Sequence, residues 1–319
     1  MKLTQAALAR SPFLAARRIA ALALTVGLAW PVPTEAATLA YESYNYSPGT
    51  AFANTPTATT AAGFTGNFTF LGEDLNIAPG ASTIGSGSLG YTDSNSNALT
   101  VSNNQYQNGH GRLLENLNTT GGGPFASYLE GVNLGANHTT LYISFAMQIG
   151  ASPAGYNGFE LFRGTSADSG RIASVNIWTG HGSGNYFLTV GEGANGGNFG
   201  GSGTSDANLG FSNTSVNFFV LRLDFGAAGT DTLSIYANPL LATEPGAPTG
   251  QVSASDLSFD RISNSTFGGG APQAVDEIRV GTTYASVTTV PEPSTMALLS
   301  MAAGAVATAG RRRRGARMN

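Results

Sequence analysis

The sequence predicts an all-β protein, an antiparallel sandwich of two sheets. Apolar and polar side chains alternate over residues 141–149 and 219–225, and a period of two is typical of strands. Glycine accounts for 43 of the 319 residues, and Gly/Asn/Ser-rich turns separate the alternating segments. Leu/Ala-rich helical stretches occur only near the two ends. Short strands at this spacing, without amphipathic helices between them, favour a two-sheet sandwich.

The individual strands follow from the same alternation. Phe219–Phe225 and Leu233–Ala237 flank the glycine-bearing turn Gly226–Gly229, so they are predicted to form a hairpin. We expect Gly191–Asn208 to be a long surface loop and Ala285–Val290 to be a short linker. Strands are predicted at Leu141–Ile149, Gly158–Arg163, Arg171–Trp178, Tyr186–Gly191, Leu257–Ile262 and Val275–Gly281.

The N-terminus has the three parts of a secretory signal peptide. Four basic residues between Lys2 and Arg18 precede the apolar stretch Ile19–Ala29, and Thr34-Glu35-Ala36 supplies small residues for cleavage. We therefore predict a signal peptide over residues 1–36. The alternative is an uncleaved N-terminal anchor, which Pro31 and Pro33 oppose because they break the apolar run.

The C-terminus combines a Pro-Glu-Pro triplet, an apolar run and an arginine cluster. The run Met296–Gly310 is 15 residues long, and a helix of 15 to 17 residues reaches roughly 25 Å against a hydrocarbon core of about 30 Å. The cluster Arg311, Arg312, Arg313 and Arg314 would stay on the cytoplasmic side. We therefore expect a short membrane-inserted helix within residues 290–319.

These three parts, in this order, resemble the PEP-CTERM sorting signal of exported bacterial proteins. The resemblance implies that exosortase, a membrane-embedded processing enzyme, acts near Pro291, Glu292 and Pro293. It also implies transient anchoring in the inner membrane, followed by delivery to the cell surface or the extracellular matrix. A permanent C-terminal anchor is the alternative.

The part of the chain between the two ends also resembles a known family. The segments Asn157–Phe162, Phe218–Pro239 and Asp276–Gly281 are similar to strands of concanavalin A-like, or laminin-G-like, jelly rolls. The resemblance covers about Tyr41–Val287 and implies one jelly-roll domain over residues 37–289. That fold hosts lectins, glycan hydrolases and adhesive modules, so it does not choose between them.

The charge of residues 37–289 limits the range of partners. This segment holds six arginines, no lysine and seventeen acidic residues, a formal net charge of −11. Such a surface repels phosphate backbones, so we expect no nucleic-acid partner. The chain contains no cysteine, which excludes disulfides, thiolate metal sites and a cysteine nucleophile.

Glycoside hydrolysis needs two carboxyl groups that face one cleft. Glu160 stands among aromatic residues without a second acid, and Asp224 has only Arg222 two positions before it. Asp276 and Glu277 are adjacent, so a regular strand would point them to opposite faces. We therefore predict no catalytic residues and no enzyme activity, and a glycan hydrolase is the third hypothesis for function.

Metal sites are weakly indicated. His110, His138 and His181 are far apart in sequence, and we expect them to be exposed loop residues. The stretch Asp93–Asn97 matches the start of a calcium-binding loop, but Ala98 and Asn104 occupy positions that need glycine and an acid. We favour an ordinary polar turn and predict no metal site and no cofactor, with calcium kept as the alternative.

Sugar binding usually needs an aromatic platform beside hydrogen-bonding amides. Trp178, Asn185 and Tyr186 lie at the two ends of a Gly/Ser-rich loop and are the candidate glycan contacts. The alternative is that Trp178 ends a strand and packs in the core. Two functions follow: a structural or adhesive protein that contacts extracellular polysaccharide or surface proteins, and a carbohydrate-binding module, with or without calcium.

Overall fold

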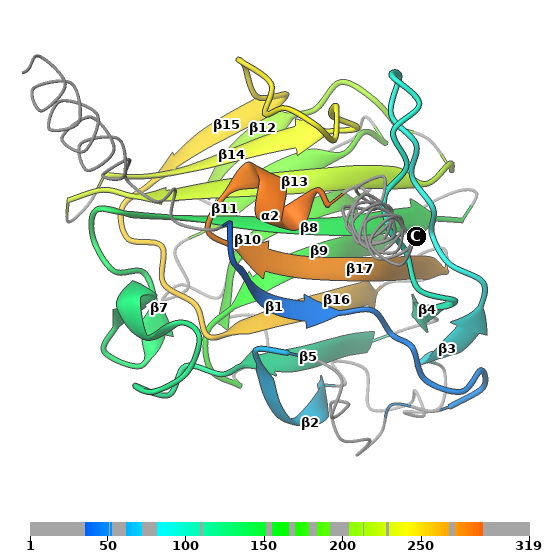
Figure 1. Cartoon of the computed structure of the whole chain (residues 1–319), viewed down its shortest axis with the longest axis horizontal. Coiled ribbons are helices and arrows are strands. Elements are labelled where there is room, and N and C mark those ends of the chain that lie inside the picture. The colour runs from blue at the N-terminus through cyan, green and yellow to red at the C-terminus, as the bar shows by residue number, and fades with distance from the viewer. Residues whose placement is uncertain are drawn as a thin grey trace, which may run out of the picture. The chain divides into compact units, whose positions relative to one another are not determined.

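A computed structural model describes residues 36–50, 52, 62–71, 82–108, 111–150, 155–165, 170–178, 184–191, 204–212, 214–227, 230–267 and 272–289 (Figure 1). Two large antiparallel sheets pack face to face in this part of the chain, which confirms the all-β sandwich. The leader before Ala36 and the chain after Thr289 lie outside the described residues. No helix within the described ranges is long and apolar enough to cross a membrane.

The first sheet has eight strands and contains the strand that ends the fold. Its order is β15-β14-β13-β8-β17-β4-β3. One edge of β17 pairs with β4 at its start, over Gln273–Val275, and with β1 at its end, over Ile278–Gly281. Figure 1 shows β1 beside β17. The strands are β1 Thr38–Glu42, β3 Ser82–Ser86, β4 Asn104–Asn108, β8 Thr139–Ile149, β13 Asn217–Phe225, β14 Asp231–Ala237, β15 Gly250–Ala254 and β17 Gln273–Gly281.

The second sheet has seven strands in the order β12-β11-β10-β9-β16-β5-β2. A short ribbon, β6 Leu129–Glu130 with β7 Asn133–Leu134, follows the 3₁₀ turn η2 Ala126–Tyr128, and the helix α2 Tyr284–Val287 closes the described chain. The strands of the second sheet are β2 Phe64–Leu71, β5 Gly111–Leu117, β9 Tyr156–Phe162, β10 Arg171–Trp178, β11 Phe187–Gly191, β12 Thr204–Asn208 and β16 Arg261–Phe267.

The main core lies between the two sheets. Phe145 of β8 stacks on Phe159 of β9 with ring centroids 3.7 Å apart, so the facing strands are in direct contact. Phe219 of β13 and Leu161 of β9 extend this contact, and all four side chains are essentially buried. Burial of large apolar side chains on this scale is the principal force that holds the sandwich together.

A second apolar cluster covers the outer face of the eight-stranded sheet. Tyr142, Ala146 and Val220 point away from the main core, and Leu241 and Val287 pack over them. Alternation with a period of two is typical of a strand with one exposed face, but the central residues of β8 are buried on both faces. The reason is that α2 lies against β8, β13 and β17 and shields this outer face (Figure 1).

Three expectations about elements need correction. The strand predicted at Leu257–Ile262 begins at Arg261 and runs to Phe267. The predicted loop Gly191–Asn208 contains β12, which pairs with β11 from Phe187↔Asn208 to Gly191↔Thr204. The predicted linker from Ala285 onward instead begins with α2. The polar sequence of β12 and the four-residue length of α2 left no periodic apolar pattern, so tertiary packing decides both structures.

Candidate functional site

A row of aromatic side chains crosses one end of the seven-stranded sheet on the face opposite the core. Strand register places Phe267 of β16 beside Tyr156 of β9, and Tyr156 beside Trp178 of β10. The rings of Phe267 and Tyr156 stack with centroids 6.1 Å apart. The row therefore extends over three neighbouring strands, and adjacent strands are about 4.8 Å apart. Phe267 and Trp178 are half-buried, so part of the row reaches the surface.

Asn185 and Tyr186 lie directly before the next strand, β11, and point to different faces of the sheet. The β10–β11 ladder ends at the pair Asn176↔Phe187, and continuing its register by two residues would bring Asn185 opposite Trp178. Asn185 is half-buried and donates a hydrogen bond from Nδ2 to Oδ1 of Asn208 at 3.1 Å. Tyr186 faces the core because successive strand residues point to opposite faces.

The environment of Tyr186 is that of a core residue. Its ring is fully buried and contacts Phe211 and Phe219, each with ring centroids 5.3 Å away. Its hydroxyl lies 3.5 Å from Nδ2 of Asn217. Of the three candidate glycan contacts, Trp178 and Asn185 lie on the outer face of the sheet, whereas Tyr186 packs in the core between the two sheets.

Next to the aromatic row lies a buried ionic cluster centred on Glu160. Arg112 Nε donates to Glu160 Oε2 at 2.9 Å, and Arg171 Nη1 lies 3.5 Å from Oε1. The hydroxyls of Tyr156 and Ser265 also donate to this carboxylate, at 2.9 and 2.6 Å. The cluster joins four strands (β5, β9, β10 and β16), and it includes Tyr156, the central ring of the aromatic row, so it fixes the position of that row.

Glu160 is held in its ionised form. Burial by itself raises the pKa of a carboxyl group, but the charges of Arg112 and Arg171 and the hydrogen bond from Ser265 outweigh it, and the pKa of Glu160 is lowered. The guanidinium of Arg112 also lies between two aromatic rings, 4.9 Å from the centroid of Phe162 and 5.0 Å from that of Phe267. A carboxylate this fully engaged is a poor general acid.

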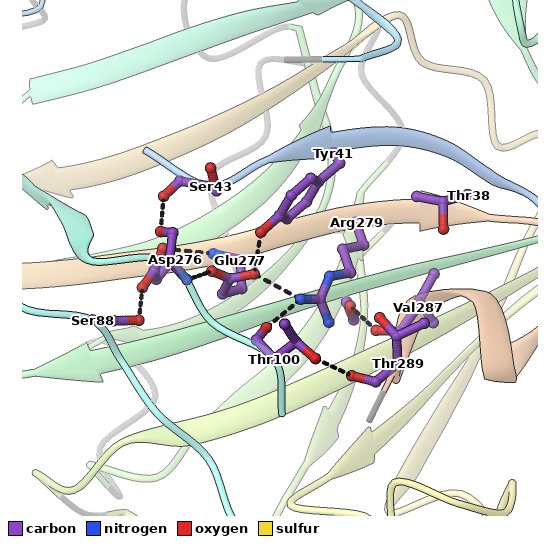
Figure 2. A network of polar contacts seen from close by, with 12 residues as sticks. Thr38, Tyr41, Ser43, Ser88, Thr100, Asp276, Glu277, Arg279, Val287 and Thr289 are labelled. Atoms are coloured by element: carbon purple, nitrogen blue, oxygen red, sulfur yellow. Dashed lines mark hydrogen bonds and ion pairs between the residues drawn. The ribbon is translucent and has the colours of Figure 1, made fainter. Parts of the chain in front are cut away.

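Asp276 and Glu277 depart from the alternation expected for adjacent strand residues. A bulge shifts the β17–β8 register between Asp276 and Arg279, and Glu277 has a positive φ of 55°. Both carboxylates enter one network (Figure 2): the amide of Glu277 donates to Asp276 Oδ1 at 2.9 Å. Tyr41 Oη and Arg279 Nη2 each donate to Glu277 Oε2 at 2.7 Å.

This second network contains a carboxyl group with a raised pKa. Burial, with a further contribution from the charge of Glu277, raises the pKa of Asp276 to about 8. Its Oδ2 accepts hydrogen bonds from the hydroxyl of Ser88 at 2.7 Å and the amide of Leu89 at 3.0 Å. The hydrogen bonds of these two acids connect strand β17 to the segment around residues 88–102.

Two further buried acids were not anticipated from the sequence. Glu115 of β5 is fully buried and accepts a hydrogen bond from the Tyr44 hydroxyl, which in turn accepts one from Asn264 Nδ2. Burial raises the pKa of Glu115 well above its ordinary value, and burial raises that of Glu42 to about 7. The alternation Leu113, Glu115, Leu117 was the signal, because it places Glu115 on the core face.

The Asp93–Asn97 stretch forms a polar turn. Asp93 Oδ1 accepts hydrogen bonds from the amides of Asn95 and Asn97, each at 2.9 Å. Its Oδ2 accepts from Asn97 Nδ2 at 3.0 Å and from the amide of Leu241 at 2.8 Å. Burial opposes ionisation here, but these hydrogen bonds outweigh it and lower the pKa of Asp93. The carboxylate therefore serves as the centre of the turn and as an anchor for Leu241.

The histidines do not form a group in the described part of the chain. His138 has a positive φ of 63° and donates its amide to the carbonyl of Phe225, while His110 and His181 lie outside the described residues. Within the described ranges, no three Asp, Glu or His side chains gather in a way that could hold a metal ion.

The described chain ends in a segment that is packed on the fold. Thr283 caps α2 in a capping box with Ser286, and Val287 is fully buried. The hydroxyl of Ser144 donates to the carbonyl of Val287 at 2.7 Å, and that of Thr288 donates to the carbonyl of Leu241 at 2.7 Å. Figure 2 shows Thr100 beside Thr289, whose carbonyl accepts the Thr100 amide at 3.4 Å.

Comparison with solved structures adds no more than the general fold. A fungal endo-β-1,4-glucuronan lyase from Trichoderma reesei is similar over 71% of this chain and 94% of its own, at 12% identity and a TM-score of 0.37. A botulinum neurotoxin type C structure described as interacting with two ganglioside molecules is similar over 74% of this chain and 48% of its own (12% identity, TM-score 0.36). The chain therefore spans about half the length of that toxin structure. No curated protein sequence matches the chain.

Residues 289–314 match the PEP-CTERM protein-sorting motif. The match begins at Thr289, the last described residue, and includes the Pro-Glu-Pro triplet, the apolar run and the four arginines. The motif implies export, transit through a membrane-anchored form and processing by an exosortase. This chain is therefore an all-β sandwich that carries a PEP-CTERM sorting signal, and the match to that signal begins at the last described residue.

Proposed function

We propose that the chain is a structural or adhesive protein of the cell surface or extracellular matrix. Its sandwich, residues 37–289, is released from a membrane tail by cleavage near Pro291–Pro293 and then acts in contact with extracellular polysaccharide or other surface proteins. The observation that carries this proposal is the sorting motif at residues 289–314. A sorting signal directly after one folded domain is what an exported domain that works outside the cell requires.

The proposal is tested by changing Pro291, Glu292 and Pro293 together to alanine in a host that makes an exosortase. We expect the variant to stay in the membrane fraction at full length, while the unaltered chain appears at the surface or in the medium. Asp256→Ala, at an exposed position of the sandwich, is the control and should be sorted like the unaltered chain. Release of the triple variant at the same rate as the control would overturn the proposal.

We further propose that the sandwich has no enzyme activity. Glu160, the acid nearest the aromatic row, is buried, ionised and bound by two arginines and two hydroxyls. Glycoside hydrolysis needs one carboxyl group that carries a proton and a second one facing it. Incubation of the purified sandwich with the host polysaccharide should therefore leave the chain length of the polymer unchanged, and shortening of the polymer would contradict this.

A second candidate function is carbohydrate binding at the aromatic row. Sugar rings stack on aromatic faces, and amide groups beside the stack hydrogen-bond to hydroxyls. Trp178 and Asn185 supply both kinds of group side by side on the outer face, and Asn208 adds a second, exposed amide. This arrangement supports a glycan platform formed by Phe267, Tyr156, Trp178 and Asn185.

The platform is tested by binding of the purified sandwich to the host's exopolysaccharide, with calcium and then with a chelator. Trp178→Ala should reduce binding roughly 2- to 10-fold without loss of folding, because one aromatic stack typically contributes about 0.5–1.5 kcal/mol. Gln251→Ala, exposed on the opposite sheet, is the matched control. Equal binding by both variants would refute the platform, and loss of binding on chelation would add calcium as a ligand.

A further inference from the structure

The chain leading into the sorting motif is held in place by several independent contacts. The side chain of Val287 is buried in the outer apolar cluster, and that of Thr288 is almost fully buried. The Thr288 hydroxyl is within hydrogen-bonding distance of the carbonyls of Leu241 and Tyr284, at 2.7 and 3.0 Å. The carbonyl of Thr289 faces the amide of Thr100. The segment from Tyr284 to Thr289 is therefore part of the packed structure.

The last of these contacts is tied to the buried acid network. Arg279 Nη2 donates to the carbonyl of Thr100 at 2.5 Å and to Glu277 Oε2 at 2.7 Å (Figure 2). Thr100, which lies beside Thr289, is thus fixed by a charged pair that is almost completely buried. Opening of the segment at Thr289 leaves this network in place, so only α2 and the two residues after it need to move.

The first residues of the sandwich contact the same C-terminal segment. The amide of Ala37 lies 3.3 Å from Thr282 Oγ1, and the Thr38 hydroxyl donates to the carbonyl of Ser286 at 2.8 Å. The start of β1 therefore lies against the segment that precedes the sorting motif. Both ends of the predicted mature domain, Ala37 and Thr289, are fixed at one corner of the eight-stranded sheet.

Chain length now sets a limit on access to the triplet. Pro291 is two residues beyond Thr289, and an extended chain spans at most about 3.6 Å per residue, so Pro291 lies no more than about 7 Å from a residue held on the sandwich. A processing enzyme that binds its substrate as an extended strand needs several residues on each side of the bond that it cleaves. The reach is about 7 Å at Pro291 and about 14 Å at Pro293, which is too short to place several residues before the cleaved bond in such a groove while Thr289 stays on the sandwich.

We propose that cleavage at the sorting motif requires the segment Tyr284–Thr289 to leave the sandwich, so that local opening of α2 controls the rate of processing. This inference rests on the proposed function, because it concerns the same sorting reaction. It assigns a positioning role to Thr100, Ser144 and Thr288, which hold the substrate chain away from the enzyme until the segment opens. Local opening of a terminal element needs much less free energy than global unfolding.

The test is a reversible disulfide lock between positions 100 and 289, whose backbones are in contact. The chain has no cysteine, so the double variant T100C/T289C contains a single cysteine pair, at two exposed positions. Full-length protein is purified in detergent, oxidised or reduced, and mixed with membranes from cells that make an exosortase. The oxidised form should be processed at least ~10-fold more slowly than the reduced form of the same protein. Single variants T100C and T289C, treated identically, control for the altered side chains.

A second variant tests whether easier access to the triplet increases the rate of processing. An insertion of about six Gly/Ser residues between Thr289 and Val290 gives the enzyme flexible chain to bind. It should be processed faster than the unaltered chain, and the T100C/T289C lock should no longer slow it. Equal rates for the locked and reduced forms would overturn the inference. Absence of any processing of the unaltered chain would instead contradict the proposed function.

Discussion

The hydroxyl of Thr288 donates a hydrogen bond to the carbonyl oxygen of Leu241 across 2.7 Å, and Leu241 in turn donates its amide to Asp93. The last residues before the sorting motif are thereby connected to a polar turn that lies almost 200 residues earlier in the sequence. This contact explains why the fold extends to Thr289, although the sequence of this region predicts a short linker.

Removal of the Thr288 hydroxyl is expected to destabilise the end of the fold. Thr288→Val keeps the shape of the side chain but leaves the buried carbonyl of Leu241 with one hydrogen bond fewer, which typically costs about 1–2 kcal/mol. Thr288→Ser keeps the hydroxyl and is the control. Hydrogen exchange of the amides of Ser286 and Thr288 measures the effect, and equal protection in the two variants would contradict the assigned role of the hydroxyl.

The buried pair Glu277–Arg279 is expected to matter more for stability than an exposed pair. Glu277→Gln leaves the guanidinium of Arg279, which is only slightly exposed, without its carboxylate, and loss of one partner of a buried pair costs about 3–5 kcal/mol. The pair Arg222–Asp224 is more than one-third exposed, so Asp224→Asn should cost less than about 1 kcal/mol. Urea unfolding of the two variants provides the comparison, and similar losses would show that burial does not set the difference.

Stability is expected to fall as the pH rises from about 5 to 8. The pKa values of Glu42 and Asp276, raised to about 7 and about 8, mean that the folded state holds protons that the unfolded state releases near pH 4. Each group therefore stabilises the fold fully below pH 4 and loses that contribution up to its folded pKa, at up to ~1.4 kcal/mol per pH unit. Asp93 and Glu160, whose pKa values are lowered, act in the opposite direction only at lower pH.

Glu42→Gln checks this pH dependence. The variant removes one titrating group while it keeps an acceptor for the amide of Tyr44, which donates to Glu42 at 2.7 Å. The slope of the melting temperature between pH 5 and 8 should become shallower than in the unaltered protein. An unchanged slope would mean that Glu42 is ionised in the folded state throughout this range.

Gly158 is expected to be required for the aromatic row. A Cβ atom at this position would lie 2.4 Å from the hydroxyl of Tyr156, which crosses over Gly158 to reach Glu160. Gly158→Ala should push Tyr156 away from Glu160 and weaken glycan binding together with stability. Tyr156→Phe, which keeps the ring but loses the hydrogen bond, should cost about 1–2 kcal/mol of stability and leave binding nearly unchanged. Parallel binding and melting measurements separate the two effects.

The sequence was sufficient to predict the fold class, but fewer than half of the strands in the described part of the chain. Period-two alternation located β8, β9, β10, β13, β14 and β17 to within a few residues, since each buries one regular apolar face. Alternation failed for β12, a Thr/Ser/Asn-rich edge strand with no apolar face of its own. It also failed for α2, whose four residues are too few to show a helical period.

The candidate site was predictable only in part. Trp178 and Asn185 could be proposed because they flank one short loop, but the separation of Tyr186 from Asn185 required the strand register. Arg112 lies on β5, 48 residues before Glu160, and Arg171 lies on the next strand, β10, so the two ion pairs depend on strand pairing and sheet order, which local patterns do not contain. The bulge at Glu277 likewise joins two acids that a regular strand would separate.

The most direct test of the central claim is the intact mass of the protein recovered from outside a cell that makes an exosortase. The account predicts a chain that begins at or near Ala37 and ends between Pro291 and Pro293, without the apolar run and the arginines. Recovery of an external protein that still contains residues 294–319 would contradict it, because the sorting motif would then have served without being processed.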